Sequence, residues 1–342
     1  MRSNQVIQAL GKAAPDVKIH VRTAAPKWLF SGPTSPAHSS CILDVGIVQP
    51  NSLELDLGQT LKACQELHQN FSELVEREIA FVEREQIDLI VGDIPPLCFE
   101  IAAAAKLPSV AISNFTWDII YDSYTDSYRG FLPLIDEMRE FYHKASLALT
   151  LPYPCDMSVF PVREPIPWIT RACSLTREQA RAVFKLPTSA TIVLLSFGGI
   201  GLNRLPWEQF YALDDFFFVA TGQSEISQRN LMVLPDAQHH YEDLLRAVDA
   251  VVSKPGYGIV ADVISQQVPI LYTDRGDFPE YARLVEALTD CTTAQYIPQR
   301  ELLAGAIGPY LEQLLSKPPH WPKVEMNGAE AAAQKIIKIL QT

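Results

Sequence analysis

The stretch that decides the fold class runs from Ala250 to Tyr281 and reads AVVSKPGYGIVADVISQQVPILYTDRGDFPEY. Apolar runs at both ends of a helix-compatible segment predict two buried strands, each followed by a polar or glycine-containing loop. The predicted order is strand, glycine loop, helix, strand and polar loop, at residues 250–252, 253–258, 259–266, 269–272 and 273–277. This is the βαβ unit of a parallel sheet, so the sequence predicts an α/β protein.

Both loops of this unit follow the carboxyl ends of strands, where α/β proteins bind ligands. In the first loop, Pro255, Gly256 and Gly258 precede or open the helix, so backbone N–H groups can approach a ligand closely. The helix N-terminus then favours an anion such as phosphate. An ordinary βα turn also uses Gly and Pro, and the local sequence leaves both interpretations open.

The composition limits the class of protein. The chain has 342 residues, which fits about two domains at roughly 150 residues each. It is 48% hydrophobic and 20% charged, as in globular proteins. Its net charge of −12 argues against a general binder of nucleic acid or anionic membranes, which needs a basic surface. No apolar run predicts a transmembrane segment, and the first residues lack a secretory signal.

The cysteines indicate a reducing compartment. All six are scattered and no CxxC pair occurs, which favours reduced thiols over a disulfide framework or a zinc site: Cys41, Cys64, Cys98, Cys155, Cys173 and Cys291. We therefore expect a cytoplasmic protein with no bound metal.

The rest of the chain predicts two α/β halves. In the first half we expect helices at residues 2–13, 26–30, 53–86 (broken near Gly58), 97–105, 117–124 and 134–145, and strands at 18–22, 41–45, 88–92, 109–112 and 147–151. Five prolines between Pro152 and Pro167 indicate a linker. The second half restarts with a strand at 190–196, and a helix at 300–315 and another at 329–340 close the chain. The expected boundaries are 1–155, a linker at 156–172, 173–325, and a closing helix at 326–342.

Two glycine-rich loops follow strands of the second half. One contains Gly198, Gly199 and Gly201, and the other contains Gly256 and Gly258. In a doubly wound domain such loops converge on one edge of the sheet. Neither has the G-x-G-x-x-G pattern, and no GxxxxGK[ST] occurs, which disfavours a dehydrogenase and a P-loop kinase.

Several motifs together resemble one family. In the second half these are FGG at 197–199, SKPGYG at 253–258 and DFPEY at 277–281, and in the first half they are TAAPKWLF at 23–30, GDIPP at 92–96 and NFTWD at 114–118. They resemble GT-B glycosyltransferase-like proteins related to the N-terminal part of plant arabinokinases, and more distantly the MurG-type glycosyltransferases. The resemblance covers nearly the whole chain.

The resemblance implies two Rossmann-like domains facing across a cleft, with a nucleotide-diphosphate sugar, expected to be a UDP-sugar, in the second and an unknown acceptor in the first. Glycine-loop amides and a basic side chain would neutralise the leaving diphosphate without a metal or other cofactor. The implied donor-site residues are Gly198, Gly199, Gly201, Lys254, Gly256, Tyr257, Gly258, Asp262, Arg275, Asp277 and Glu280. Asp93 or Asp118 would act as general base on the acceptor.

Each of these roles has a plainer alternative. Lys254 could be a solvated surface lysine, and Tyr257 could cap the core. Asp277 and Glu280 could be helix N-terminal acids, and Asp118 a helix cap. In the family, a Thr or Ser and a Glu follow the SKPGYG loop. The corresponding positions of this chain hold Ile259, Ala261 and Asp262 instead.

A second departure concerns the start of the chain. The family has a first strand and a glycine-rich, histidine-containing loop before the first helix, whereas this sequence begins with that helix. A central strand is thus expected to be missing, which should expose neighbouring backbone groups or force a rearrangement. Three explanations of this departure remain open: a misassigned start, a truncated product, or a protein that binds its ligand without catalysis. The leading expectation is a UDP-sugar-dependent glycosyltransferase, with a non-catalytic binding protein and a nucleotide-sugar epimerase as alternatives.

Overall fold

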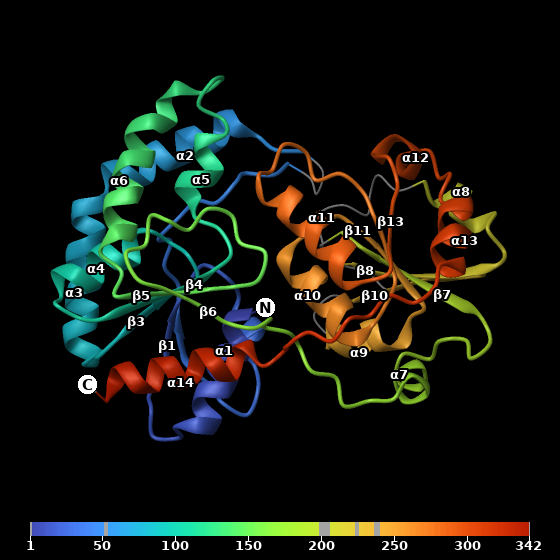
Figure 1. The fold of residues 1–342 in the computed structure, drawn as a ribbon, viewed down its shortest axis with the longest axis horizontal. Helices are drawn as coiled ribbons and strands as arrows, with labels where there is room; N and C mark the ends of the chain where they lie inside the picture. The colour runs from blue at the N-terminus through green and yellow to red at the C-terminus, as the bar shows by residue number, and fades with distance from the viewer. Residues whose placement is uncertain (1, 51–53, 198–205, 223–225, 236–239, 342) are drawn as a thin grey trace.

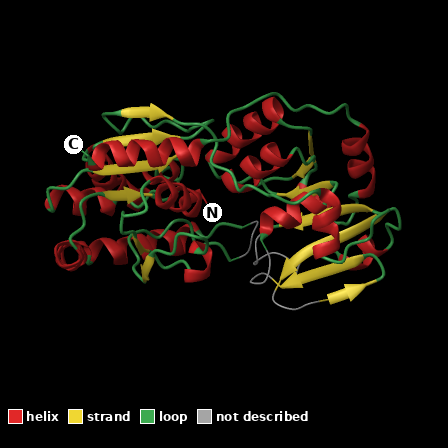
Figure 2. Ribbon diagram, turned by 90° about the horizontal axis from the view of Figure 1, so that it is seen from below, coloured by secondary structure: helices red, strands yellow, loops and turns green. Residues whose placement is uncertain are grey.

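The computed structural model describes residues 2–50, 54–197, 206–222, 226–235 and 240–341, and it forms two α/β lobes (Figure 1). The glycine loop with Gly198, Gly199 and Gly201 lies outside these residues. The second view shows the two lobes side by side, each containing both strands and helices (Figure 2). The α/β architecture expected from the sequence is confirmed.

The first lobe contains two parallel sheets. One pairs β1 (His20–Arg22) with β2 (Ala37–Ser39), and the other has the order β3-β4-β5-β6. The strands of the larger sheet are β3 (Ile90–Gly92), β4 (Ser109–Ser113), β5 (Leu147–Thr150) and β6 (Arg163–Pro165). The helices are α1 (Arg2–Ala13), η1 (Lys27–Phe30), α2 (Leu57–Gln69), α3 (Phe71–Glu85), α4 (Leu97–Ala104), α5 (Trp117–Asp122), η2 (Arg129–Phe131) and α6 (Leu132–His143).

The first lobe has a gap at the position where the sequence lacks the expected strand. Among the described residues, β1 is hydrogen-bonded only to β2, and β3 only to β4. A cavity of about 1100 Å³ lies between the facing edges of β1 and β3 and is lined by residues from both strands. The sheet is therefore split where a central strand would lie.

The second lobe is built on one seven-stranded sheet with the order β13-β12-β11-β7-β8-β10-β9. All neighbours are parallel except β9 and β10. The strands are β7 (Thr191–Ser196), β8 (Phe216–Gly222), β9 (Ile226–Gln228), β10 (Leu231–Pro235), β11 (Ala250–Ser253), β12 (Ile270–Tyr272) and β13 (Ala294–Tyr296). The helices are α7 (Arg177–Val183), α8 (Trp207–Tyr211), α9 (Tyr241–Ala247), α10 (Tyr257–Gln266), α11 (Glu280–Cys291), α12 (Gln299–Leu303), α13 (Gly308–Ser316) and α14 (Gly328–Leu340).

The last helix returns to the first lobe. Helix α14 packs along α1, and both ends of the chain lie on that lobe (Figure 1). Val6 and Leu10 of α1 share one buried cluster with Ala333 and Ile336 of α14, and the same cluster continues into the sheet of the second lobe. The core therefore joins the two lobes. A Cβ added to Gly328, where α14 begins, would lie 2.1 Å from the carbonyl oxygen of Pro167.

Several predicted boundaries are wrong. The second strand lies at Ala37–Ser39 rather than 41–45, because the polar AHS segment pairs with β1 without an apolar pattern. The long helix breaks at Asn70, which ends α2 and begins α3, and not near Gly58. The linker contains an edge strand, β6, and the closing segment at 300–315 forms two helices, α12 and α13. The sequence also did not predict β9 or β13.

Two further observations concern the environment of the chain. All six cysteines are free thiols, and Cys41, Cys64, Cys98 and Cys291 are buried. Within the described ranges, no helix combines the length and the apolar character that crossing a bilayer would require.

Candidate functional site

The switch point of the second sheet lies between β7 and β11. From this pair the sheet grows through β8 in one direction and through β12 in the other. Loops after the two strands of such a pair diverge and leave room for a ligand. Residues 254–256 form the loop after β11, and α10 begins at Tyr257 with the glycines Gly256 and Gly258 at its N-terminus.

Among the described residues, Gly256 and Gly258 are explained by neither packing nor backbone conformation. A Cβ added at either position would meet no atom of the described residues within 4 Å. Gly256 has a φ of −141°, an extended conformation open to any residue. The space beside both glycines is therefore open, and N–H groups at the first turn of α10 are accessible to an anion.

Two basic side chains lie next to this turn. Lys254 follows β11 and Arg275 follows β12, so both come from carboxyl ends of adjacent strands. Burial lowers the pKa of Lys254 to about 8, and the nearby positive charge of Arg275 contributes to the same shift. Two basic side chains therefore lie close together beside the first turn of α10, an arrangement that is favourable for a phosphate ligand.

A buried carboxylate connects Arg275 to the first lobe. Glu280 is the first residue of α11 and is 2% exposed. Its Oε2 atom accepts a hydrogen bond from Arg275 at 2.5 Å, and its Oε1 atom accepts one from Asn114 Nδ2 at 2.7 Å. Asn114 follows β4 and is fully buried. A polar contact between the lobes is therefore made at the carboxyl ends of β4 and β12.

Helix α1 adds an arginine to this group. Arg2 Nη1 donates to Asn114 Oδ1 at 3.0 Å, and Arg2 Nε donates to Asp93 Oδ1 at 2.8 Å. Its guanidinium lies 5.3 Å from the centre of the Tyr257 ring. Burial alone would lower the pKa of Arg2, but Asp93 more than offsets this and the pKa is raised. We call Arg2, Asp93, Asn114, Tyr257, Arg275 and Glu280 the junction cluster.

Asp262 lies outside the junction cluster. It is on α10, 2% exposed, and both of its oxygens accept hydrogen bonds from Arg171 in the linker. Arg171 also lies over the ring of Tyr241, whose hydroxyl is 2.8 Å from Ser196 Oγ. Asp262 therefore fastens the linker to α10 in this structure, and its expected role in binding the nucleotide sugar stays a prediction.

Three further acidic residues expected in the site, Asp277, Asp118 and Asp93, lie in different surroundings. Asp277 is exposed, and its carbonyl oxygen accepts a hydrogen bond from Tyr124 of the first lobe. Asp118 is 1% exposed and pairs with Arg139 of α6 at 3.1 Å, so the structure does not bring it to the junction cluster. Asp93 is in the cluster, where Arg2 and Ser3 both donate to its carboxylate.

Sequence reasoning did not select Arg2 and Asn114. Asn114 follows a predicted strand, and that position was the available signal. Arg2 had no signal, because its partners Asp93 and Asn114 are 91 and 112 positions away. Only the packing of α1 across the ends of β3 and β4 brings them together.

Comparisons with known proteins agree with this architecture. No family model matches the chain. L-arabinokinase of Arabidopsis thaliana is 28% identical over 338 residues, which cover 96% of this chain and 32% of that protein. The glycosyltransferase of kitacinnamycin superposes with a TM-score of 0.63 at 16% identity, covering 99% of this chain and 91% of its own. The calicheamicin glycosyltransferase CalG4 gives 0.61 at 12% identity, over 99% and 90%.

The chain has the GT-B fold of these glycosyltransferases. A further solved relative of this fold is the glycosyltransferase VinC in complex with DTDP, which superposes with a TM-score of 0.54 at 15% identity over 100% of this chain and 92% of its own. This GT-B-like chain spans about a third of the length of the arabinokinase it matches.

Proposed function

We propose that the protein is a glycosyltransferase that takes a sugar from a nucleotide-diphosphate sugar, with UDP as the nucleotide, and passes it to an acceptor held by the first lobe. The observation that carries the proposal is the open space beside Gly256 and Gly258 at the switch point of the second sheet. Glycines that no internal contact requires are expected where a ligand approaches the backbone.

The charges around this space suit a diphosphate. In glycosyl transfer the sugar–phosphate bond breaks and negative charge develops on the leaving diphosphate. The first N–H groups of α10 and the side chains of Lys254 and Arg275 would stabilise that charge. Because Lys254 has a pKa of about 8, an approaching diphosphate would favour its charged form. Gly198, Gly199 and Gly201 follow β7 and would complete the diphosphate site.

The acceptor side of the proposal rests on Asp93. A general base on an acceptor hydroxyl needs a free carboxylate oxygen. In this structure Arg2 and Ser3 both hold the carboxylate of Asp93. Asp93 could accept a proton only after one of these contacts is exchanged for the acceptor.

This observation favours a second candidate, a GT-B-like protein that binds a nucleotide sugar without transferring it. Ile259 and Ala261 also lack the hydroxyl groups that would hold a donor next to α10. Both candidates require nucleotide binding, so a binding measurement tests their common part and a turnover measurement separates them. Release of UDP that depends on an acceptor supports transfer, and formation of an epimer without an acceptor would instead support an epimerase.

Isothermal titration with UDP, dTDP, ADP and GDP tests the binding site directly. We expect UDP to bind in the micromolar to low millimolar range. Gly258→Ala should weaken this binding at least about tenfold, because a methyl group enters the space that the diphosphate needs. The same change places Ala in the first turn of a helix and should raise the free energy of unfolding by up to about 1 kcal/mol.

Gly328→Ala is the matched control. Its added methyl group would meet the carbonyl oxygen of Pro167, so it should lower stability without a specific effect on UDP affinity. Absence of UDP binding at millimolar concentration, or equal affinity in the Gly258 variant and the unchanged protein, would contradict the proposed site.

A cytoplasmic location is part of the proposal and is supported by six free thiols.

A further inference from the structure

One buried carboxylate, Glu280, holds a residue of each lobe. Its Oε1 atom accepts a hydrogen bond from Asn114 Nδ2 at 2.7 Å, and its Oε2 atom accepts one from Arg275 Nη1 at 2.5 Å. Asn114 follows β4 of the first lobe, whereas Arg275 follows β12 of the second. These three residues therefore form a continuous hydrogen-bonded chain from one lobe to the other, which we call the relay.

Arg275 is held on a second side by an aromatic ring. Its guanidinium lies 4.1 Å from the centre of the Phe278 ring. Phe278 is 5% exposed and packs in a core cluster of the first lobe, where Phe115 meets it edge to face with ring centroids 6.3 Å apart. An ion pair and a stacked ring together restrict where a planar guanidinium can point. The direction of Arg275 is therefore set by contacts that the first lobe supports.

One donor of this arginine is left over. The Nε atom of Arg275 is buried and makes no hydrogen bond within the part of the chain that the structure describes. Buried donors are nearly always paired, so a native donor without a partner in the protein calls for a bound group. Arg275 also lies close enough to Lys254 for its charge to lower the pKa of that lysine. Arg275 thus has a donor to spare beside the other cation of the proposed diphosphate site.

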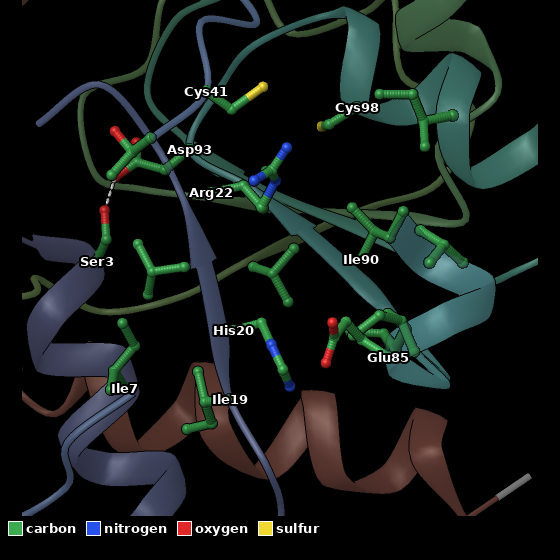
Figure 3. A pocket seen from close by; sticks show the side chains of 18 of the residues that line it. Ser3, Ile7, Ile19, His20, Arg22, Cys41, Glu85, Ile90, Asp93 and Cys98 are labelled. Carbon is green, nitrogen blue, oxygen red and sulfur yellow. Dashed lines mark hydrogen bonds between the residues drawn. The ribbon is translucent and has the colours of Figure 1, made fainter. Parts of the chain in front are cut away.

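Asp93, the other carboxylate of the junction cluster, does not connect the lobes. Arg2 and Ser3 of α1 donate to it, and Figure 3 shows the bond from Ser3 within the first lobe. Within the junction cluster, Glu280 is therefore the carboxylate through which the first lobe can act on the donor side.

We propose that Asn114 is a positioning residue for the donor diphosphate and acts on it through Glu280 and Arg275. The inference rests on the proposed nucleotide site and adds a residue of the acceptor lobe to it. Asn114 holds the carboxylate of Glu280, Glu280 holds Nη1 of Arg275, and Nε of Arg275 is left to donate to a phosphate oxygen. The affinity for UDP therefore depends on the contact between the lobes, and by linkage bound UDP strengthens that contact.

Calorimetric titration with UDP measures the effect of Asn114→Ala in two backgrounds. In the otherwise unchanged protein we expect about tenfold weaker binding, because Glu280 and with it Arg275 lose their fixed orientation. Arg275→Gln keeps an amide that can donate to Glu280 but removes the guanidinium. In that background Asn114→Ala should change the affinity less than about twofold, because the side chain through which Asn114 acts is gone.

The two backgrounds separate the relay from the nucleotide site itself. A loss of affinity of equal size in both, or no loss in either, would overturn the relay alone. Absence of UDP binding to the unchanged protein would overturn the nucleotide site and the relay together. If Asn114→Ala does not fold, Asn114→Asp takes its place with the same expectations, because it has nearly the same volume and cannot donate to Glu280 when charged.

Tyr153→Phe is the matched control. The Tyr153 hydroxyl, which follows β5, donates to Asp290 Oδ2 at 3.1 Å, at the opposite end of α11 from the relay. Its removal should leave UDP affinity within about twofold of the unchanged protein. A loss as large as that of Asn114→Ala would mean that any contact with α11 influences the nucleotide, and this result would overturn the specific role of Asn114.

Hydrogen exchange tests the reciprocal effect of the nucleotide on the first lobe. UDP should slow exchange in α5, which follows Asn114 in the chain, and this slowing should be absent in Asn114→Ala. Slowing confined to the second lobe of the unchanged protein would show that nucleotide binding does not reach Asn114, and it would overturn the proposal.

Discussion

The pH dependence of UDP affinity tests whether Lys254 belongs to the proposed site. The pKa of Lys254 is lowered to about 8 by burial and by Arg275, so it is mostly charged at pH 7 and mostly neutral at pH 9.5. A diphosphate binds the charged form, and its own charge does not change in this range because the second pKa of a phosphate is about 6. The affinity for UDP should therefore fall as pH rises through 8.

Titration calorimetry at pH 7.5 and 9.5 measures this effect. We expect UDP affinity to fall about tenfold or more between the two values, because binding must then recharge the lysine. Lys254→Arg keeps a charge at both pH values and should show little change. The same fall in the arginine variant would mean that another group titrates and that Lys254 does not hold the diphosphate.

At the scale of elements, one ion pair joins the linker to α10. Arg171 Nε donates to Asp262 Oδ2 at 3.0 Å, and the side chain of Asp262 is 3% exposed. Removing one partner of a buried pair leaves an uncompensated charge, which costs about 3 kcal/mol or more. Asp262→Ala should therefore lower the free energy of unfolding by about 3 kcal/mol, measured by urea denaturation.

The exposed pair Asp214–Arg229 is the matched control, with side chains 59% and 77% exposed. Asp214→Ala should change stability by less than about 1 kcal/mol, because solvent screens such pairs. If Asp262→Ala were as mild as this control, the pair would not fasten the linker. If Asp262→Ala folded normally but lost UDP affinity, the carboxylate would instead serve the nucleotide, as the sequence predicted.

At the scale of the whole molecule, Asn114 and Glu280 join the lobes by a bond between residues 166 positions apart. Asn114→Ala removes the amide donor from a carboxylate that is 2% exposed and leaves Arg2 without one of its acceptors. An unmade buried hydrogen bond costs about 1–3 kcal/mol. We expect a corresponding loss in the free energy of unfolding and faster hydrogen exchange in α11.

The exposed side chain of Asn70 provides the comparison, since its amide donates to the carbonyl of Glu66 at the surface. Asn70→Ala should cost less than Asn114→Ala and should leave exchange in α11 unchanged. Equal stability of the two variants, or unchanged exchange in α11 of Asn114→Ala, would show that the Asn114–Glu280 hydrogen bond does not hold the lobes together.

The amino-acid sequence was enough to predict the strands and helices that are buried. The apolar runs of β7 and β11 lie in the centre of a sheet, so composition and burial agree. The sequence was not enough to predict β2, because residues Ala37–Ser39 have no apolar pattern and are held by pairing with β1. It also did not predict the helix break at Asn70. Boundaries set by a cap or by a neighbouring strand carry little local signal.

The sequence by itself determined an α/β protein of two halves and a glycine loop before α10, because these depend on local periodicity and on spacing along the chain. The tertiary structure decided the rest. It left open space beside Gly256 and Gly258, lowered the pKa of Lys254 to about 8, and placed Arg2, Asn114 and Glu280 in contact. Burial, electrostatic proximity and hydrogen bonding between distant residues exist only after the lobes have packed.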